Sequence, residues 1–188
     1  MRSLEGQTAL VSGGGSPIGR AIALALSARG VHIVVTGRDE KALGETVGEI
    51  AHGGGKARHL AGDERDPVHL GRAVDRAIEL FGGLDIAVHA DAIGVECTFS
   101  VASPRLRTPG RFVVAMVGAD RGVVAGVVRE HTGALFVRGI TCNALILEGA
   151  ATADAVEDAA ANVAEIAVFL CGGAAARITG QAIAIRAT

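Results

Sequence analysis

The segment from Thr8 to Leu26 constrains the fold of this chain more than any other. It runs from a short apolar stretch, Thr8–Ser12, through a loop of small residues, Ser12–Gly19, into an apolar helical pattern that begins at Pro17. Glycines let a backbone turn sharply, and the N-terminus of a helix presents free N–H groups and the positive end of its dipole. This order of strand, glycine loop and helix predicts a cradle for an anion such as a pyrophosphate.

Composition narrows the class of protein and its partners. The chain has 188 residues, of which 49% are hydrophobic, so we expect a single domain over residues 1–188 with a sizeable core. Its net charge is −2 with both signs interspersed, which argues against a nucleic-acid or membrane-surface partner. No apolar run is long enough for a membrane span, and the first residues do not resemble a secretory signal. Three scattered cysteines, Cys97, Cys142 and Cys171, show no metal-ligand spacing, so we expect free thiols, no metal site and a cytoplasmic protein.

Apolar stretches typical of strands alternate with helical patterns through most of the chain. We predict strands at Thr8–Ser12, Val31–Thr36, Ala57–Ala61, Leu84–His89, Arg111–Val117, Gly139–Leu145 and Gln181–Ile185, of which Val31–Thr36 and Leu84–His89 are expected to be buried. We predict helices at Pro17–Arg29, from an N-cap at Asp39 to about His52, from Asp66 through Phe81, at Gly122–His131 and at Asp154–Cys171. Such alternation predicts an α/β fold: a Rossmann-like, doubly wound parallel sheet of about seven strands with helices on both faces. The crossovers at 93–109 and 118–137 are short, and the first shows little helical periodicity.

Three features should meet at the carboxyl edge of that sheet, where doubly wound folds bind nucleotides. The first is the glycine loop. The second is Arg38, which follows the strand that ends at Thr36 and suits the 2′-phosphate of NADP; Asp39 is better explained as a helix cap. The third is Asp63, which ends the next strand and could meet an adenine edge. Arg38 alone could be a solvated charge and Asp63 an ordinary turn residue. Together the three features favour NADP(H) over NAD(H), and a chain that binds no cofactor stays open.

At this point the chain resembles the short-chain dehydrogenase/reductase family. The matching segments follow the family's order along nearly the whole chain: Ser12–Gly19, Thr36–Arg38, Asp63–Asp66, Gly83–Val88, Gly110–Val114, Arg138–Asn143 and Ile178–Gln181. The resemblance implies a dinucleotide-binding fold and a set of cofactor contacts. These contacts would come from Gly13, Gly15, Ser16, Ile18, Gly19, Arg38, Asp63, Glu64 and Ala90.

The sequence departs from the family pattern where the chemistry resides. Pro17 stands where the family has a glycine, although proline also suits the first turn of a helix because its φ is preset. The family's Asn-Asn-Ala-Gly segment is His89–Ala92 here, and Gly118 or a neighbour stands in the place of the catalytic serine. The chain has no tyrosine, and no lysine follows Lys56, so the family's Tyr-x-x-x-Lys pair has no counterpart. Carbonyl reduction needs an acid that protonates the developing alkoxide, so the family mechanism implies weak or atypical activity.

The catalytic residues therefore stay unknown at this stage. His89 and Asp91, two apart at a strand end and predicted to face the same way, could form an acid/base pair or a metal site, or could satisfy local backbone. His131 is expected near a helix end, where the dipole favours a cation. Three further histidines, His52, His59 and His69, are expected at the surface. Cys97 has no visible base partner that would make it a nucleophile.

Three functions remain open from the sequence. The first is an NADP(H)-dependent oxidoreductase acting on a small-molecule substrate. The second is a non-catalytic NADP(H)-binding or scaffold protein, and the third is a diverged lyase, isomerase or cyclase without hydride transfer. The resemblance also implies a homodimer through the helix and strand of residues 154–185, while the short crossovers disfavour a larger assembly. The substrate cannot be named from the sequence.

Overall fold

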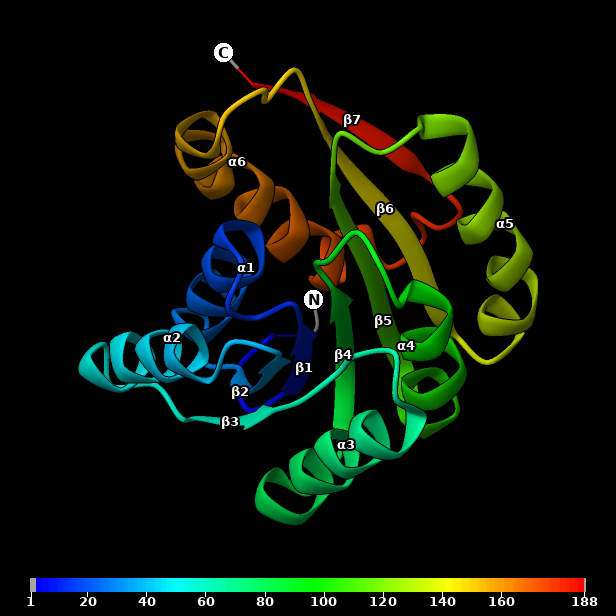
Figure 1. Ribbon diagram of the computed structural model, residues 1–188. Coiled ribbons are helices and arrows are strands. Elements are labelled where there is room, and N and C mark those ends of the chain that lie inside the picture. The colour runs from blue at the N-terminus through cyan, green and yellow to red at the C-terminus, as the bar shows by residue number, and fades with distance from the viewer. Residues whose placement is uncertain (1–2, 188) are drawn as a thin grey trace.

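The computed structural model describes residues 3–187 and contains a seven-stranded sheet with helices on both faces (Figure 1). The strands are β1 (Thr8–Ser12), β2 (His32–Gly37), β3 (Ala57–Ala61), β4 (Leu84–His89), β5 (Leu106–Val117), β6 (Ile140–Glu148) and β7 (Ala182–Arg186). Their spatial order is β3-β2-β1-β4-β5-β6-β7, and every neighbouring pair is parallel. The predicted α/β doubly wound fold with about seven strands is confirmed.

The helices connect the strands in the alternation expected of parallel sheets. They are α1 (Pro17–Ser27), α2 (Glu40–His52), α3 (Pro67–Phe81), α4 (Val95–Ala102), α5 (Arg121–Val137) and α6 (Ala153–Cys171), with short 3₁₀ turns η1 (Ser103–Arg105) and η2 (Gly173–Ala175). The predicted caps are confirmed: Asp39 accepts a hydrogen bond from the Ala42 N–H at 3.1 Å, and Asp66 accepts one from the Val68 N–H at 2.9 Å. Within residues 3–187, no helix is both long and apolar enough to cross a bilayer.

The core divides into two layers because alternate strand residues point to opposite faces of the sheet. On one face, Ala9 and Val11 of β1 pack in a cluster with residues of α1, α2 and α6. On the other face, Leu10 packs in a cluster with residues of α3, α4 and α5. Figure 1 shows α1 and α6 side by side on the first face. Both faces of the central strands are thus buried, which explains their nearly continuous apolar stretches.

The strand order reverses its direction between β1 and β4. The chain moves outward from β1 through β2 to β3, returns to pair β4 with β1, and then proceeds outward to β7. Loops at such a switch point diverge above and below the sheet and leave a crevice at the carboxyl ends of the strands. The glycine loop after β1 and the segment after β4 flank this crevice, so the topology places both at one site.

Two crossovers differ from the prediction. The segment 93–109 was expected to show little helical structure, but it contains the helix α4, a 3₁₀ turn and the first residues of β5. The helix predicted at Gly122–His131 is α5, which begins at Arg121 and continues to Val137. Both helices pack inward with few apolar residues, namely Phe99 of α4 and Val124 and Val128 of α5 among others. Their extent depends on this packing more than on a regular sequence pattern.

The structure confirms the predicted positions of two histidines and contradicts those of two others. His52 and His59 are exposed, as predicted. His69 is only 7% exposed, so its predicted surface position is wrong; its Nε2 lies 2.7 Å from the Thr36 hydroxyl. His131 does not lie at a helix end, since α5 continues beyond it, and its ring stacks on Phe99 while its Nε2 lies 3.0 Å from Glu96. The position of both rings depends on contacts with other elements.

Candidate dinucleotide site

The loop Ser12–Gly19, here called the cradle, is held by close backbone contacts that require glycine. Gly13 has a φ of +78°, and a Cβ there would collide with the Ala90 carbonyl. A Cβ at Gly19 would collide with the Gly13 carbonyl oxygen. The side chain of Ser16 closes the loop, because its Oγ accepts from the Gly19 N–H at 3.1 Å and lies 2.8 Å from the Gly13 carbonyl oxygen. The cradle is therefore a fixed structure with no room for larger residues at these two glycines.

Two backbone N–H groups of the cradle have no acceptor among the described residues, those of Gly15 and Ile18. The other amides are engaged: Gly14 donates to the Thr36 carbonyl at 3.0 Å, and Ser16 donates to Gly13 at 2.9 Å. Pro17 has no N–H at all. Free amides at the start of α1, together with the helix dipole, form a site for an anion. The proline reduces the number of donors but does not remove them.

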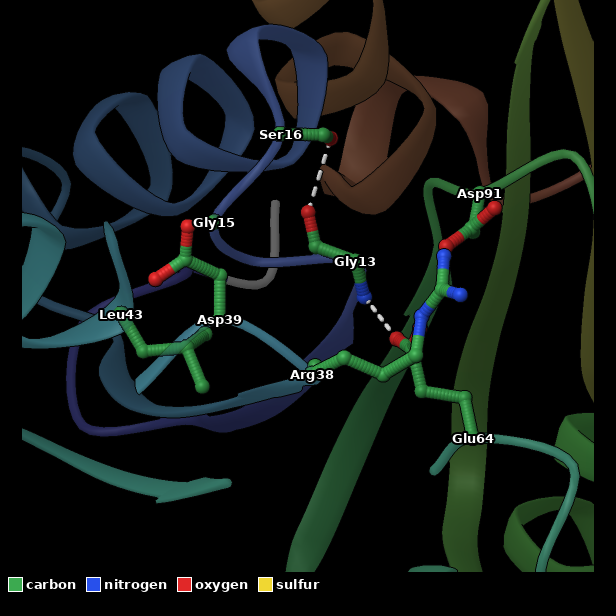
Figure 2. Close-up of a pocket in the computed structure, with 9 residues that line it drawn as sticks. Gly13, Gly15, Ser16, Arg38, Asp39, Leu43, Glu64 and Asp91 are labelled. Atoms are coloured by element: carbon green, nitrogen blue, oxygen red, sulfur yellow. Dashed lines mark hydrogen bonds between the residues drawn. The ribbon is translucent and has the colours of Figure 1, made fainter. Parts of the chain in front are cut away.

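A cavity of about 350 Å³ opens beside the cradle, here called the Arg38 cavity. Its lining comes from the cradle, from the end of β2 and the start of α2, from the segment after β3, and from the segment after β4 (Figure 2). The lining residues are Gly13, Gly15, Ser16, Gly37, Arg38, Asp39, Leu43, Glu64 and Asp91. In Figure 2 the Arg38 side chain extends across the cavity on the side of Glu64 and Asp91. Within residues 3–187, Arg38 forms no ion pair, so its guanidinium is available to a ligand.

Two further cavities continue along the carboxyl edge of the sheet. The Ala90 cavity, of about 230 Å³, shares Ser16 and Asp91 with the first and is lined by Ser16, Pro17, Ile18, Ala90, Asp91, Ala92, Ala115, Met116, Val117 and Val156. The valine cavity, of about 240 Å³, shares Ala92 and Met116 with the second and is lined by Ala92, Val95, Val114, Met116, Ala119, Asp120, Val123, Val124, Val127 and Val128. The three cavities thus form a row that is charged at one end and apolar at the other. A dinucleotide with polar phosphates and a flatter, less polar ring at its far end matches this gradient.

Glu64 is the most unusual ionisable group of the site. Its side chain is 3% exposed, and its Oε1 accepts hydrogen bonds from the Ser12 hydroxyl at 2.6 Å and from the Gly13 N–H. Burial raises the pKa of Glu64 to about 7, partly offset by the Ser12 hydrogen bond and reinforced by the neighbouring Asp91 carboxyl group. The carboxyl group thus titrates near neutral pH directly beneath the cradle.

Asp63, by contrast, faces Arg65 and not the cavity. Its two carboxylate oxygens lie 2.8 to 3.2 Å from the Arg65 guanidinium, and this hydrogen bonding lowers the pKa of Asp63 to about 2. Asp63 is not among the residues that line the Arg38 cavity. Its predicted contact with an adenine edge therefore stays a prediction, and it would require the Arg65 side chain to share its partner.

The structure does not bring His89 and Asp91 together as an acid/base pair. The His89 ring is fully buried and its Nδ1 lies 3.0 Å from the Thr98 hydroxyl of α4, whereas Asp91 lines the cavities. Burial lowers the pKa of His89 to about 4, so the ring is neutral at neutral pH. His89 is the last residue of β4, whereas Asp91 follows the strand, and the two side chains have different partners.

Most of the predicted cofactor residues meet at this edge of the sheet. Those that line the Arg38 cavity or the Ala90 cavity are Gly13, Gly15, Ser16, Ile18, Arg38, Glu64 and Ala90. Gly19 is the last residue of the cradle and packs against the Gly13 carbonyl without lining a cavity. Asp39 and Leu43 were not predicted as lining residues. Asp39 was interpreted only as a helix cap, but it both caps α2 and lines the Arg38 cavity. No signal in the sequence marked Leu43, which is one apolar residue of an amphipathic helix.

Comparison with known proteins identifies a family whose members share this fold. A family model described as short chain dehydrogenase matches residues 7–107. Among curated proteins, the chain is 31% identical over 122 residues to a tetrahydroxynaphthalene reductase of Pestalotiopsis fici, an alignment that covers 61% of this chain and 44% of that protein. It is 42% identical over 84 residues to a versicolorin reductase of Emericella nidulans, covering 44% of this chain and 32% of that protein. The chain thus spans less than half the length of the curated relatives it matches.

Among solved structures, the whole fold is similar to a short chain dehydrogenase from Burkholderia cenocepacia in complex with NADP. The TM-score is 0.81 with 26% identity, covering 99% of this chain and 98% of that chain. A hydroxysteroid dehydrogenase from Escherichia coli has a TM-score of 0.85 at 22% identity, covering 98% and 97% of the two chains, and at that identity the likeness concerns the fold alone.

Proposed function

We propose that this chain, which belongs to the short chain dehydrogenase family, binds NADP(H) along the carboxyl edge of its sheet and acts as an oxidoreductase with weak or atypical turnover. The observation that carries the proposal is the Arg38 guanidinium, which lines a cavity beside the cradle and forms no ion pair with any described carboxylate. An arginine at the end of the second strand suits a 2′-phosphate, whereas an acidic residue there suits the ribose hydroxyl of NAD. The NADP in the Burkholderia relative is consistent with this preference.

The residues present fit such a cofactor. Gly13 lets the Ala90 carbonyl pack against the cradle, which fixes the loop, and the amides of Gly15 and Ile18 are free to donate to a pyrophosphate. Arg38 would hold the 2′-phosphate through charge-assisted hydrogen bonds. The Ala90 cavity would take the nicotinamide, which when bound would supply a hydride to a carbonyl compound or accept one from an alcohol. The chain's own residues would position the dinucleotide and exclude water from the apolar end of the row.

The proton half of such a reaction has few candidates in this chain. Within the described residues that line the Ala90 and valine cavities, the ionisable side chains are Asp91 and Asp120. The Asp120 carboxylate caps α5 by accepting from the Val123 N–H at 2.9 Å, and the chain has no tyrosine. Asp91 is therefore the candidate proton donor, and a carboxyl group in this place is the reason we propose weak or atypical turnover.

A second candidate function is a non-catalytic NADP(H)-binding protein. The six valines of the valine cavity favour it, because such a lining supplies no proton donor and no hydrogen bond to a developing alkoxide. The two functions share the cofactor site and differ only in turnover. Oxidation of NADPH with a panel of neutral aldehydes and ketones separates them: turnover that disappears in Asp91→Asn supports the oxidoreductase, and tight binding without oxidation supports the binding protein.

The cofactor assignment is tested by NADPH and NADH titrations of Arg38→Ala. Loss of charge-assisted hydrogen bonds worth about 1.5–3 kcal/mol should weaken NADPH binding roughly 10- to 100-fold and leave NADH binding nearly unchanged. Fluorescence titration measures both affinities. The matched control is Lys56→Ala, which removes one exposed cation before β3, at the opposite edge of the sheet, and should change neither affinity. Equal losses for NADPH and NADH in Arg38→Ala would overturn the assignment of the 2′-phosphate to this residue.

We also propose a homodimer through residues 154–185. Its support is that β7 is the edge strand of the sheet and that Phe169 of α6 is 48% exposed. Sedimentation analysis of the purified protein tests this assembly.

A further inference from the structure

Two carboxyl groups from different segments meet between the Arg38 cavity and the Ala90 cavity. Glu64 follows β3 and reaches beneath the cradle to the Ser12 hydroxyl and the Gly13 N–H. Asp91 follows β4 and lines both cavities. Glu64 and Asp91 both line the Arg38 cavity, and burial together with the neighbouring Asp91 carboxyl group raises the pKa of Glu64. Two carboxyl groups can hydrogen-bond to each other only if one of them carries a proton. The pair is therefore a place where the site holds a proton.

The surroundings do not neutralise this pair. Arg38 and Asp39 line the Arg38 cavity with this pair, and the other ionisable groups of the surrounding segments are Asp63, Arg65, His69 and His89. Arg65 is engaged by Asp63, and burial lowers the pKa of both histidines, so that their rings are neutral. Arg38 is the one cation that lines the cavity, and Asp39 adds a further negative charge. Within the described residues, neither Glu64 nor Asp91 forms an ion pair with a cation.

We propose that the cradle takes up its dinucleotide together with one proton, and that Glu64 and Asp91 share this proton. A dinucleotide brings phosphate charges into a cavity whose lining already contains two adjacent carboxyl groups. With both carboxylates ionised, the cavity repels the phosphates and Arg38 is the single opposing charge. With one proton on the pair, a carboxyl–carboxylate hydrogen bond replaces the repulsion. This inference rests on the proposed function, because it requires that the chain binds a nicotinamide dinucleotide.

Because proton binding and dinucleotide binding are thermodynamically linked, the sign of the pKa shift determines whether NADPH affinity rises or falls with pH. A bound anion stabilises the protonated form of the pair, so binding shifts the pKa of Glu64 upward from about 7 in the free protein. The affinity for NADPH should then fall about tenfold per pH unit above pH 7. The 2′-phosphate has its second ionisation near pH 6, so it is fully charged throughout this range and cannot cause the decline.

The experiment measures the affinity of the full chain for NADPH from pH 6.5 to 9 and, by calorimetry in two buffers of different ionisation enthalpy, the protons taken up on binding. We expect uptake approaching one proton at pH 8 and an affinity that declines steadily above pH 7. Glu64→Gln keeps an acceptor for Ser12 and Gly13 but does not titrate. It should abolish most of the proton uptake and bind NADPH about tenfold more tightly than the natural chain at pH 8. Asp91→Asn should flatten the profile in the same way.

The matched control is Glu79→Gln on α3, an exposed carboxylate that pairs with Arg76 far from the cavities. It should leave both the pH profile and the proton uptake unchanged. If the natural chain binds NADPH equally well at pH 7 and pH 9 with no proton uptake, the inference is overturned and the proposed function stands. If neither NADPH nor NADH binds at any pH, including 6.5, the proposed function fails and the inference fails with it. Circular dichroism establishes that each variant is folded, and Asp91→Asn decides the outcome where Glu64→Gln does not fold.

Discussion

The cradle after β1 and the helix α5 both contain several glycines, but these glycines lie in opposite surroundings. A Cβ at Gly13 or Gly19 would collide with backbone carbonyl groups, whereas a Cβ at Gly126 or Gly133 of α5 would meet nothing within 4 Å. In the cradle, glycine is required by close approach of one backbone segment to another. In α5, glycine only raises the conformational entropy of the unfolded chain and lowers helix propensity. The comparison indicates that close packing requires glycine in the cradle, whereas nothing around Gly126 and Gly133 of α5 requires it.

The largest expected effect is that of Gly19→Ala. The added methyl group would collide with the Gly13 carbonyl oxygen, which belongs to fixed backbone and cannot move without opening the cradle. Overpacking of this kind costs about 3 kcal/mol, and a chain of this size loses about 2–4 °C of Tm for each kcal/mol. Thermal unfolding should therefore show a Tm lower by about 6–12 °C. NADPH affinity should fall at least tenfold, because the free amides of Gly15 and Ile18 move with the loop. An unchanged Tm together with unchanged NADPH affinity would contradict the tight packing of the cradle.

The two halves of the chain also differ in how well their elements could be predicted from the sequence. The elements of residues 8–89 have local signals: short apolar stretches for the strands, and Asp39 and Asp66 directly before their helices. The side-chain oxygen of each of those caps accepts a hydrogen bond from an amide two or three residues away, so the signal is contained in the sequence. The predicted strands and helices of this half match the structure to within a few residues.

The second half has fewer local signals. The helix α4 begins after Gly94, which supplies no side-chain cap, and is anchored by Phe99 stacked on Phe112 of β5 with ring centroids 3.9 Å apart. That stacking depends on a contact between two elements, which periodicity in one segment does not reveal. The continuation of α5 past His131 depends in the same way on Leu135, which packs into the core. Tertiary packing therefore explains why α4 was not predicted and why the predicted α5 ended too early.

In the candidate site, too, the positions of residues with local sequence signals were predicted, and the positions set by contacts between distant segments were not. The cradle and Arg38 were predicted because a strand, a glycine loop and a helix fix their positions relative to one another. The buried position of Glu64 was not predictable, because it requires the loop after β3 to turn beneath the loop after β1. The separation of His89 from Asp91 likewise depends on where β4 ends and on the Thr98 hydroxyl of α4. Both residues are positioned by contacts between distant parts of the chain.

The next prediction concerns His89, which connects the first and second halves of the chain because it ends β4 and contacts Thr98 of α4. Its pKa of about 4 lies below the value of about 6.5 for an exposed histidine, so the unfolded chain binds this proton more readily than the folded one. Stability from the neutral ring is present above pH 6.5 and is lost as the pH falls through 6.5 toward 4. At pH 5 the loss is on the order of 2 kcal/mol.

His89→Asn keeps a polar group for Thr98 but cannot titrate. Urea unfolding at pH 7 and pH 5 should show a smaller acid-induced loss of stability in this variant than in the natural chain. His59→Asn is the matched control, since His59 is exposed on β3, and it should leave the difference between the two pH values unchanged. An equal acid sensitivity in His89→Asn and the natural chain would mean that burial does not hold the ring neutral. The contact between the end of β4 and α4 would then be looser than the structure shows.

The smallest expected effect is that of Gly126→Ala, and it has the opposite sign to that of Gly19→Ala. Gly126 lies inside α5, and a Cβ there meets open space. Alanine should stabilise the chain by about 0.5–1 kcal/mol, because it restricts the unfolded state and favours the helix. Thermal unfolding should show a Tm higher by about 1–4 °C with NADPH affinity unchanged. A decrease in Tm would show that α5 is packed against another segment at this position. The statement that α5 tolerates a side chain where the cradle does not would then be wrong.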